Sequence, residues 1–425
     1  MPTPSLILVP ARFKTGKLYT PVATTSGGLV LGASGDFNVT RATTATRVNA
    51  SGFIESVASG IPRLDYFASG GVVGCPALLV EPAATNSIRN NTMVGAVTGS
   101  PGTLPTNWAN DIGTLTQTIV ATGVVSGITY IDIRLSGTAS LNVNTIALET
   151  TTAITASVGQ AWTESAYLSV VSAPNPPTNY QAAIQERNAA GTYLTDGTQN
   201  LTLTSNLTRY SFTRTLTNAN TGRVTPAIYL PTTIGQAYNF TLRIGLPQME
   251  QSSVATSVIP TTTAAVTRNA DVINVSGAVS GCIGQTEGTL YAEVDIRTFA
   301  NLGVFLSISN GGGNDRIEIY KNTDSKIYFD RVSATASGTT SVSSTSTYSA
   351  GILKVAVAYK SGDTIMYING SPATTVQTAT FTFLPITKIN IGTNRADISQ
   401  FNDRIRAAAL YTTKLTNAQL AALTT

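Results

Sequence analysis

Short segments in which hydrophobic and polar residues alternate recur along most of the chain. The alternation is clearest in Tyr130–Leu135 and Tyr210–Arg214. A period of two residues is typical of β-strands that have one buried and one solvated face. Turn residues lie between such segments, as in Ala189–Thr192 and in Asn369-Gly370, which is typical of a type I′ turn. The pattern therefore predicts antiparallel strands joined by tight turns.

The predicted strands form two series, one within residues 85–260 and one within residues 268–425. The first series comprises Leu115–Ala121, Ile128–Leu135, Trp162–Val171, Tyr180–Arg187, Asn200–Thr204, Thr208–Thr215, Arg223–Leu230 and Ala237–Ile244. The second comprises Thr289–Ile296, Gly303–Ser309, Arg316–Tyr320, Lys326–Arg331, Leu353–Lys360, Thr364–Ile368, Thr387–Ile391 and Ile405–Tyr411. Many short strands without a helical period are typical of β-sandwiches. We predict an all-β fold with two antiparallel β-sandwich (jelly-roll) domains.

Helix is predicted only at the C-terminal end of the sequence. Thr416 and Gln419 have the spacing of a capping box, and Leu420 and Leu423 follow on one face. The Ser/Thr-rich stretch 333–349 is compatible with a strand and a long loop. Residues 261–267 have the composition of a linker.

Residues 1–84 are rich in proline and glycine and poor in predicted strands. Short extended segments are expected at Gly28–Leu31, Gly52–Val57 and Ala77–Val80. Because this segment has little apolar surface of its own, we expect it to fold against a neighbouring subunit or the next domain. We interpret it as an attachment and oligomerisation segment, without which the rest of the chain would fold as a monomer.

Composition excludes several classes of function. The 425 residues include 68 threonines but no histidine, and charged residues make up only 11%. Without histidine there is no Ser-His-Asp or Cys-His catalysis and no histidine metal ligand. The net charge of +4 is not gathered in a basic stripe, so we expect no nucleic-acid partner. The two cysteines, Cys75 and Cys282, indicate neither a disulfide framework nor a zinc site. No run of residues is apolar and long enough for membrane insertion, and we predict no cofactor.

Three aromatic residues are candidates for carbohydrate binding. Trp108 lies in a predicted loop, where stacking on a sugar and capping the edge of the sandwich are alternative roles. Tyr180 and Tyr193 flank a predicted hairpin. Trp162 opens a strand and is more typical of a core residue.

Two other patterns could carry chemistry. Glu293 and Asp295 would point to the same side of a strand, as the paired carboxylates of glycosidases do. A structural role is the preferred interpretation, because a third carboxylate of the glucanase pattern is replaced at Arg297–Thr298. Asn310–Asp315 could chelate calcium, but it lacks the spacing of a dedicated loop, and a glycine-rich turn is preferred. We therefore predict no catalytic residue and no metal site.

The order of several motifs resembles a family of tailed-phage and prophage virion proteins described as tail-fibre, head-fibre or receptor-binding proteins. The motifs are Asp36–Glu55, Ile61–Tyr66 and Cys75–Asn86. The segments Leu246–Glu250, Ser257–Thr261 and Thr267–Asp271 are similar to the close of a carbohydrate-binding-module-like jelly roll. The stretch from Glu287 to Thr425 is similar to a laminin-G or concanavalin A-like lectin sandwich.

The resemblance implies a non-enzymatic virion component made in the host cytoplasm. It would be a homotrimeric fibre or spike that binds other virion proteins through residues 1–84 and contacts host surface glycans. A capsid head-fibre or decoration protein without glycan binding is the first alternative. A polysaccharide depolymerase and a bacterial surface adhesin are further alternatives. A depolymerase would need clustered carboxylates, and an adhesin would need a secretion signal.

Overall fold

The computed structural model describes residues 2–19, 22–23, 29–30, 36–66, 68–69, 72–277, 279–334 and 340–425. The chain divides into two compact units. Unit 1 combines residues 1–83 with residues 269–425, and unit 2 comprises residues 84–268. Both units are built from antiparallel sheets, as the sequence predicts.

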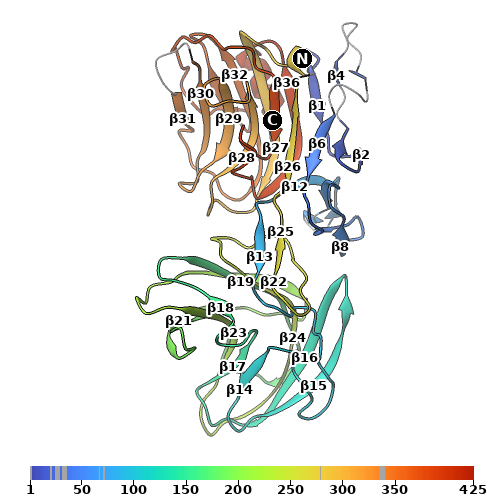
Figure 1. Cartoon of the computed structure of the whole chain (residues 1–425), viewed down its shortest axis with the longest axis vertical. Coiled ribbons are helices and arrows are strands. Elements are labelled where there is room, and N and C mark those ends of the chain that lie inside the picture. The colour runs from blue at the N-terminus through green and yellow to red at the C-terminus, as the bar shows by residue number, and fades with distance from the viewer. Residues whose placement is uncertain are drawn as a thin grey trace. The chain divides into compact units, whose positions relative to one another are not determined.

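One sheet of unit 1 has the order β34-β33-β32-β27-β36-β1-β4-β5, and β12 and β9 extend from β36 (Figure 1). These strands are β1 (Leu6–Leu8), β4 (Val22–Ala23), β5 (Leu29–Val30), β9 (Arg63–Asp65), β12 (Ala77–Val80), β27 (Glu287–Ile296), β32 (Gly351–Lys360), β33 (Ile365–Ile368), β34 (Ser371–Pro372) and β36 (Asp403–Tyr411).

The other large sheet of unit 1 has the order β2-β3-β6-β26-β35-β28-β29-β30-β31. Its strands are β2 (Phe13–Lys14), β3 (Lys17–Leu18), β6 (Phe37–Thr40), β26 (Val272–Ser276), β28 (Gly303–Ser309), β29 (Arg316–Lys321), β30 (Ile327–Val332), β31 (Thr340–Ser343) and β35 (Lys388–Ile391). Two hairpins, β7 (Ala45–Val48) with β8 (Ile54–Val57) and β10 (Ala68–Ser69) with β11 (Val72–Val73), and the 3-10 turn η1 (Ser280–Cys282) complete the unit with helix α1 (Asn417–Thr424).

The helix and several strands agree with the sequence prediction. Thr416 caps α1, and the reciprocal Thr416–Gln419 capping box is present. Within the stretch 333–349 the structure has β31, whereas residues 335–339 lie outside the described residues. Among the described residues no helix has the length and apolar character needed to cross a membrane.

The N-terminal segment, which the sequence leads us to expect against a neighbouring subunit or the next domain, packs with the C-terminal part of its own chain. β1 and β12 pair with β36, and β6 pairs with β26, so residues 1–83 contribute strands to both sheets of the C-terminal sandwich (Figure 1). Leu6, Leu8, Phe37, Leu78 and Val80 are buried in the same core as the C-terminal strands. The segment has little apolar surface because it needs only enough to complete this core.

A cluster of buried charges joins the two parts of unit 1. Asp271 accepts hydrogen bonds from Arg41 (2.9 Å) and from Arg63, and Arg63 also donates to Glu81 (2.7 Å). Through Arg297, the cluster continues to Asp403, which also pairs with Lys321. The buried ion cluster thus comprises Arg41, Arg63, Glu81, Asp271, Arg297, Asp403 and Lys321, of which Arg297 is partly exposed (31%). Its first four members lie in the sequence motifs within residues 36–86 and 267–271.

Unit 2 is a sandwich of two antiparallel sheets. One has the order β14-β17-β23-β20-β21, with β18 beside β23, and the other has the order β15-β16-β24-β19-β22. The strands of the first are β14 (Ala109–Asp111), β17 (Val143–Ala147), β18 (Ile154–Thr155), β20 (Tyr180–Arg187), β21 (Tyr193–Leu201) and β23 (Arg223–Pro231). Those of the second are β15 (Thr116–Val125), β16 (Ile128–Thr138), β19 (Ala161–Asn175), β22 (Thr208–Thr215) and β24 (Ala237–Glu250).

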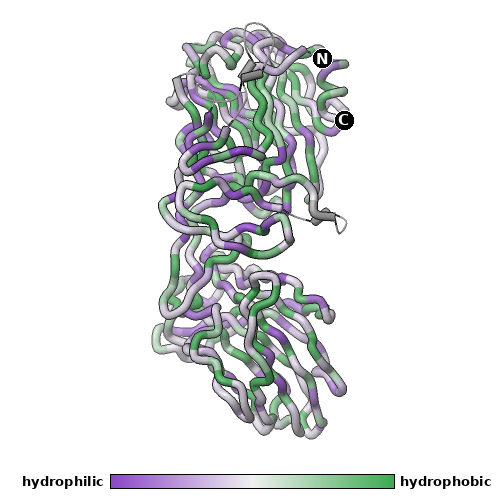
Figure 2. The backbone as a smooth tube through the Cα atoms, turned by 90° about the vertical axis from the view of Figure 1, so that its right-hand side faces the viewer, coloured by the Kyte–Doolittle hydropathy of each residue, from purple (hydrophilic) through white to green (hydrophobic). Residues whose placement is uncertain are grey.

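The ends of unit 2 meet in a short ladder of β13 (Ala84–Asn86) and β25 (Val266–Arg268). The predicted linker 261–267 therefore ends in a strand. Figure 2 shows hydrophobic and hydrophilic positions interspersed along the strands of each unit, as expected for sheets with one buried face.

Candidate glycan-binding site

The predicted residue Tyr193 belongs to a hydrogen-bonded cluster on the outer face of the β20–β21–β23 sheet. On β20, Ala182 and Ile184 face the core, so Gln185 and Arg187 lie on the opposite, outer face. β21 places Asp196 directly opposite Gln185. From β23 comes Tyr229, whose ring packs with Ala183 and Ala227. We call Gln185, Arg187, Tyr193, Asp196 and Tyr229 the Asp196 cluster.

Asp196 is the hydrogen-bond acceptor at the centre of the cluster. Its Oδ2 atom accepts hydrogen bonds from the hydroxyl groups of Tyr193 (3.0 Å) and Tyr229 (2.8 Å). Burial and the bond to Asp196 both raise the pKa of Tyr229, so this phenol remains a donor. The other oxygen, Oδ1, has no hydrogen bond from the described residues, and Asp196 as a whole is partly exposed. It can accept a hydrogen bond from a ligand hydroxyl.

Gln185 and Arg187 fix the positions of the two aromatic rings. The Gln185 amide donates to the Tyr229 hydroxyl (2.8 Å), and its Oε1 atom accepts from Arg187 Nη2 (2.6 Å). The Arg187 guanidinium lies 5.9 Å from the centroid of the Tyr193 ring, and Arg187 Nη1 donates to the Gly191 carbonyl. Tyr193 itself is 48% exposed. The cluster therefore combines a positioned, exposed aromatic ring with a carboxylate acceptor and guanidinium donors.

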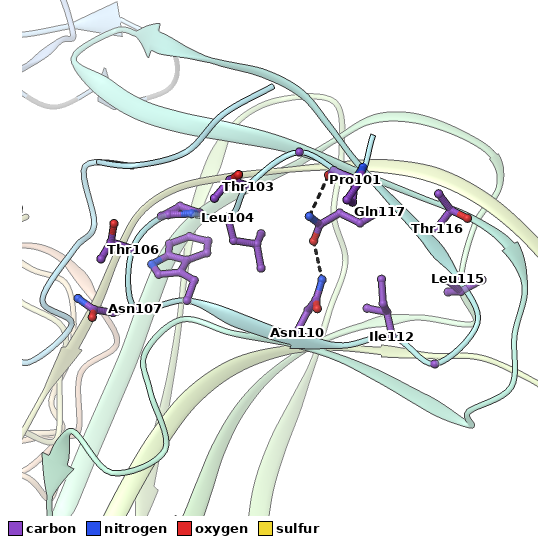
Figure 3. A pocket seen from close by; sticks show the side chains of 14 residues that line it. Pro101, Thr103, Leu104, Thr106, Asn107, Asn110, Ile112, Leu115, Thr116 and Gln117 are labelled. Atoms are coloured by element: carbon purple, nitrogen blue, oxygen red, sulfur yellow. Dashed lines mark hydrogen bonds between the residues drawn. The ribbon is translucent and has the colours of Figure 1, made fainter. Parts of the chain in front are cut away.

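Trp108 lies mainly in the core of unit 2. It is 7% exposed, and its indole nitrogen donates to the Asn90 carbonyl (2.9 Å). Trp108 is one of 14 residues between 101 and 117 that line a pocket of about 680 Å³, shown in Figure 3. In the same pocket Gln117 accepts from Asn110 (2.5 Å) and donates to Pro101 (3.0 Å). This position favours the capping role over stacking, because little of the ring is accessible.

Tyr180 is also buried. It is 9% exposed, and its ring packs edge-on against Phe240. Burial raises its pKa to about 12. Of the three residues predicted to bind carbohydrate, only Tyr193 therefore lies at the surface beside other polar groups. The sequence analysis missed Gln185, Arg187, Asp196 and Tyr229. They lie on three adjacent strands, β23, β20 and β21, and the separation of these strands in sequence conceals that the residues meet.

The paired carboxylates and the glycine-rich turn are engaged by the protein. Glu293 pairs with Arg406 (2.6 Å) and Asp295 with Arg404 (3.3 Å). Asp315 is buried, and its Oδ1 atom accepts from the backbone amides of Ala334 and Leu384. Within the described part of the chain no three His, Cys, Asp or Glu residues are placed to share a metal ion. These contacts favour the structural interpretation of both patterns.

Comparisons with known proteins gave structural likenesses only. No protein-family model matches the chain, and no curated protein matches it. The carbohydrate-binding module CBM40 of the Ruminococcus gnavus IT-sialidase is 13% identical, covering 35% of this chain and 88% of its own, with a TM-score of 0.31. Domain 4 of AbnA, a GH43 extracellular arabinanase from Geobacillus stearothermophilus solved with arabinotriose, is 14% identical, covering 37% and 73%, with a TM-score of 0.30. The Trypanosoma rangeli sialidase is 11% identical, covering 96% and 82%, with a TM-score of 0.28.

Proposed function

We propose that the protein is a structural component of a phage virion, a fibre or spike that contacts host surface glycans through the Asp196 cluster. The observation that carries glycan contact is the exposed Tyr193 ring beside a carboxylate that has one oxygen available. A pyranose ring has an apolar C–H face, which packs on an aromatic ring, and hydroxyl groups at its edge, which donate to carboxylates. The virion role is supported by the motifs in residues 36–86 and 246–271.

Glycan binding is tested by replacing residues of the cluster in the full-length chain. We expect Tyr193→Ala and Asp196→Ala each to weaken binding to a responsive glycan by about tenfold, which corresponds to about 1.4 kcal/mol. Affinity is measured on an array of bacterial surface oligosaccharides and then by calorimetry. Gln199→Ala is the matched control, because Gln199 is exposed on the same strand but faces the other way. Binding that is equal in all three variants would contradict the assignment of the site.

The virion role is tested separately from glycan binding. Purified particles of the phage that encodes the chain should contain it, and an antibody against residues 269–425 should label them in electron micrographs. Labelled particles whose protein binds no glycan would support the decoration-protein alternative. Particles without the chain would contradict the virion role.

A further inference from the structure

A second cluster of tyrosines and carboxylates lies on the outer face of a unit 1 sheet, on strands β29 and β30. Ile317 and Ile319 of β29, and Ile327 and Phe329 of β30, are buried in the core. The residues that alternate with them, Tyr320, Tyr328 and Asp330, therefore lie on the opposite face. The register places Tyr320 directly opposite Tyr328.

The two tyrosine rings form a continuous aromatic surface. Their centroids are 5.3 Å apart and their planes differ by 16°, which is an offset-stacked arrangement. Both residues are partly exposed. Cross-strand aromatic pairs stabilise hairpins, but that role does not need hydrogen bonds that fix the hydroxyl groups.

Each hydroxyl group is nevertheless held by its own carboxylate. Tyr328 donates to Asp324 Oδ2 (2.6 Å), and Tyr320 donates to Asp330 Oδ1 (3.1 Å). The Ser341 hydroxyl on neighbouring β31 lies 3.2 Å from the Tyr320 hydroxyl. The Tyr320–Tyr328 platform, defined as Tyr320, Asp324, Tyr328, Asp330 and Ser341, repeats the chemistry of the Asp196 cluster on a different sheet of the chain.

The charges of the platform differ from those of the Asp196 cluster. Asp324 and Asp330 contribute two carboxylates, and Lys326 near Asp324 contributes one ammonium group. The platform and Lys326 together carry one net negative charge, and Glu318, which lies opposite Asp330, is itself paired with Arg316 and Arg395. The carboxylates beside the two rings therefore disfavour a carboxylate- or sulfate-bearing sugar. In the Asp196 cluster, by contrast, the Arg187 guanidinium balances the single carboxylate.

We infer that the Tyr320–Tyr328 platform is a second glycan-binding surface, selective for uncharged, hydroxyl-rich oligosaccharides. The aromatic rings would pack on the C–H face of a sugar, and Asp324, Asp330 and Ser341 would accept its hydroxyl hydrogens. This inference goes beyond the proposed function because it places a separate site, with its own charge preference, in unit 1. Two weak sites in one chain would increase the overall affinity for a surface that displays many glycans.

The test compares paired neutral and acidic oligosaccharides on one array, probed with the full-length chain. We expect Tyr328→Ala to weaken binding to neutral hexose and N-acetylhexosamine oligosaccharides about tenfold, with Asp324→Ala weakening it less. Asp324 is an exposed side chain, so this second variant keeps the test informative if Tyr328→Ala fails to fold. Asp324→Ala should also admit uronate-bearing or sialylated partners that the wild-type platform repels.

The outcomes separate this inference from the proposed function. If Tyr193→Ala abolishes all binding and Tyr328→Ala and Asp324→Ala change none, the second site is overturned and the Asp196 cluster stands. If the unit 1 variants abolish neutral-glycan binding and Tyr193→Ala has no effect, the second site stands and the Asp196 assignment fails. A wild-type chain that binds no glycan on the array overturns both.

Discussion

Replacing Asp271 with alanine is expected to destabilise unit 1 by about 3–5 kcal/mol, the cost of breaking a buried ion pair by removing one partner. The Asp271 side chain is 2% exposed, and those of Arg41 and Arg63 are fully buried. Without the carboxylate, both guanidinium groups would remain in the protein interior with less compensation. The backbone amide of Glu81, which donates to Asp271 Oδ2 (3.0 Å), would also lose its acceptor.

Because of the position of Asp271, the expected loss of unfolding free energy is larger than the contribution of one salt bridge. Asp271 directly precedes β26, whereas Arg41 and Arg63 belong to the N-terminal segment. Arg41 also donates to the carbonyls of Thr43 (3.0 Å) and Ala58 (2.6 Å) and so fixes the loop that it closes. Loss of Asp271 therefore weakens the attachment of residues 36–66 to the sandwich as well as the ion pair itself.

The two tryptophans allow the unfolding of unit 1 to be separated from that of unit 2. Trp108 and Trp162 are the only tryptophans in the sequence, and both are buried in the core of unit 2. Denaturant unfolding followed by circular dichroism reports both units, whereas tryptophan fluorescence reports unit 2. Asp271→Ala should move the unfolding transition of unit 1 to lower denaturant concentration. That transition is seen by circular dichroism but not by tryptophan fluorescence.

The matched control is Glu55→Ala in the same segment. Glu55 pairs with Arg47 (2.7 Å), but the carboxylate is 35% exposed, and exposed pairs contribute about 0–1 kcal/mol. An Asp271→Ala variant that is as stable as Glu55→Ala would show that the buried ion cluster does not hold the segment in place.

The sequence predicts a structural feature well when the pattern that indicates the feature lies within a few neighbouring residues. Strands Tyr180–Arg187 and Thr208–Thr215 have the predicted bounds. In the second strand the prediction rests on the alternation of Tyr210–Arg214, a signal that neighbouring positions carry. The helix follows from Thr416 and Gln419 for the same reason. Pairing between distant segments has no such signal. Leu78 of β12 lies opposite Ile405 of β36, and nothing in either segment indicates its partner.

The candidate site illustrates the same limit at the level of single residues. Tyr193 is recognisable as an aromatic residue at a predicted hairpin, but Tyr229 and Asp196 meet only because β23 and β21 both flank β20. The motifs within residues 36–86 and 267–271 likewise contain Arg41, Arg63, Glu81 and Asp271 without showing that they form one buried cluster. A charged residue in an otherwise apolar or threonine-rich segment is a usable signal for such a cluster, since buried charges need partners.

Replacing Glu164 with glutamine is expected to stabilise unit 2 at neutral and alkaline pH, because the neutral amide removes the cost of a buried carboxylate that has no charged partner among the described residues. Glu164 alternates on β19 with Trp162 and Ala166, which belong to the core, and it is 1% exposed. Neither of its oxygens has a hydrogen-bond partner within normal distance. Burial raises the pKa of this carboxyl well above its usual value of 4.5, opposed by the nearby backbone amides of Ala227 and Ala183.

The sign of the pH dependence follows from proton binding. Since the pKa is higher in the folded state, the folded chain holds the proton more tightly than the unfolded chain does. The stabilising contribution is fully present below the unfolded pKa, near 4.5, and is lost as the pH rises towards the folded value. Glutamine is neutral at every pH, so the difference between the variant and wild type should be small near pH 4 and should grow up to the folded pKa.

Tryptophan fluorescence measures this difference directly, because both tryptophans lie in unit 2. Glu149→Gln is the matched control: Glu149 is also fully buried in unit 2, but its carboxylate accepts from the Arg89 guanidinium (2.8 Å) and the Arg89 backbone amide (2.8 Å). Removing that charge should destabilise the unit, because the ion pair is lost and no buried, unpaired charge is relieved. A Glu164→Gln variant whose stability follows that of wild type across pH 4–9 would show that the Glu164 carboxyl finds a partner in solution, such as a buried water molecule between the sheets.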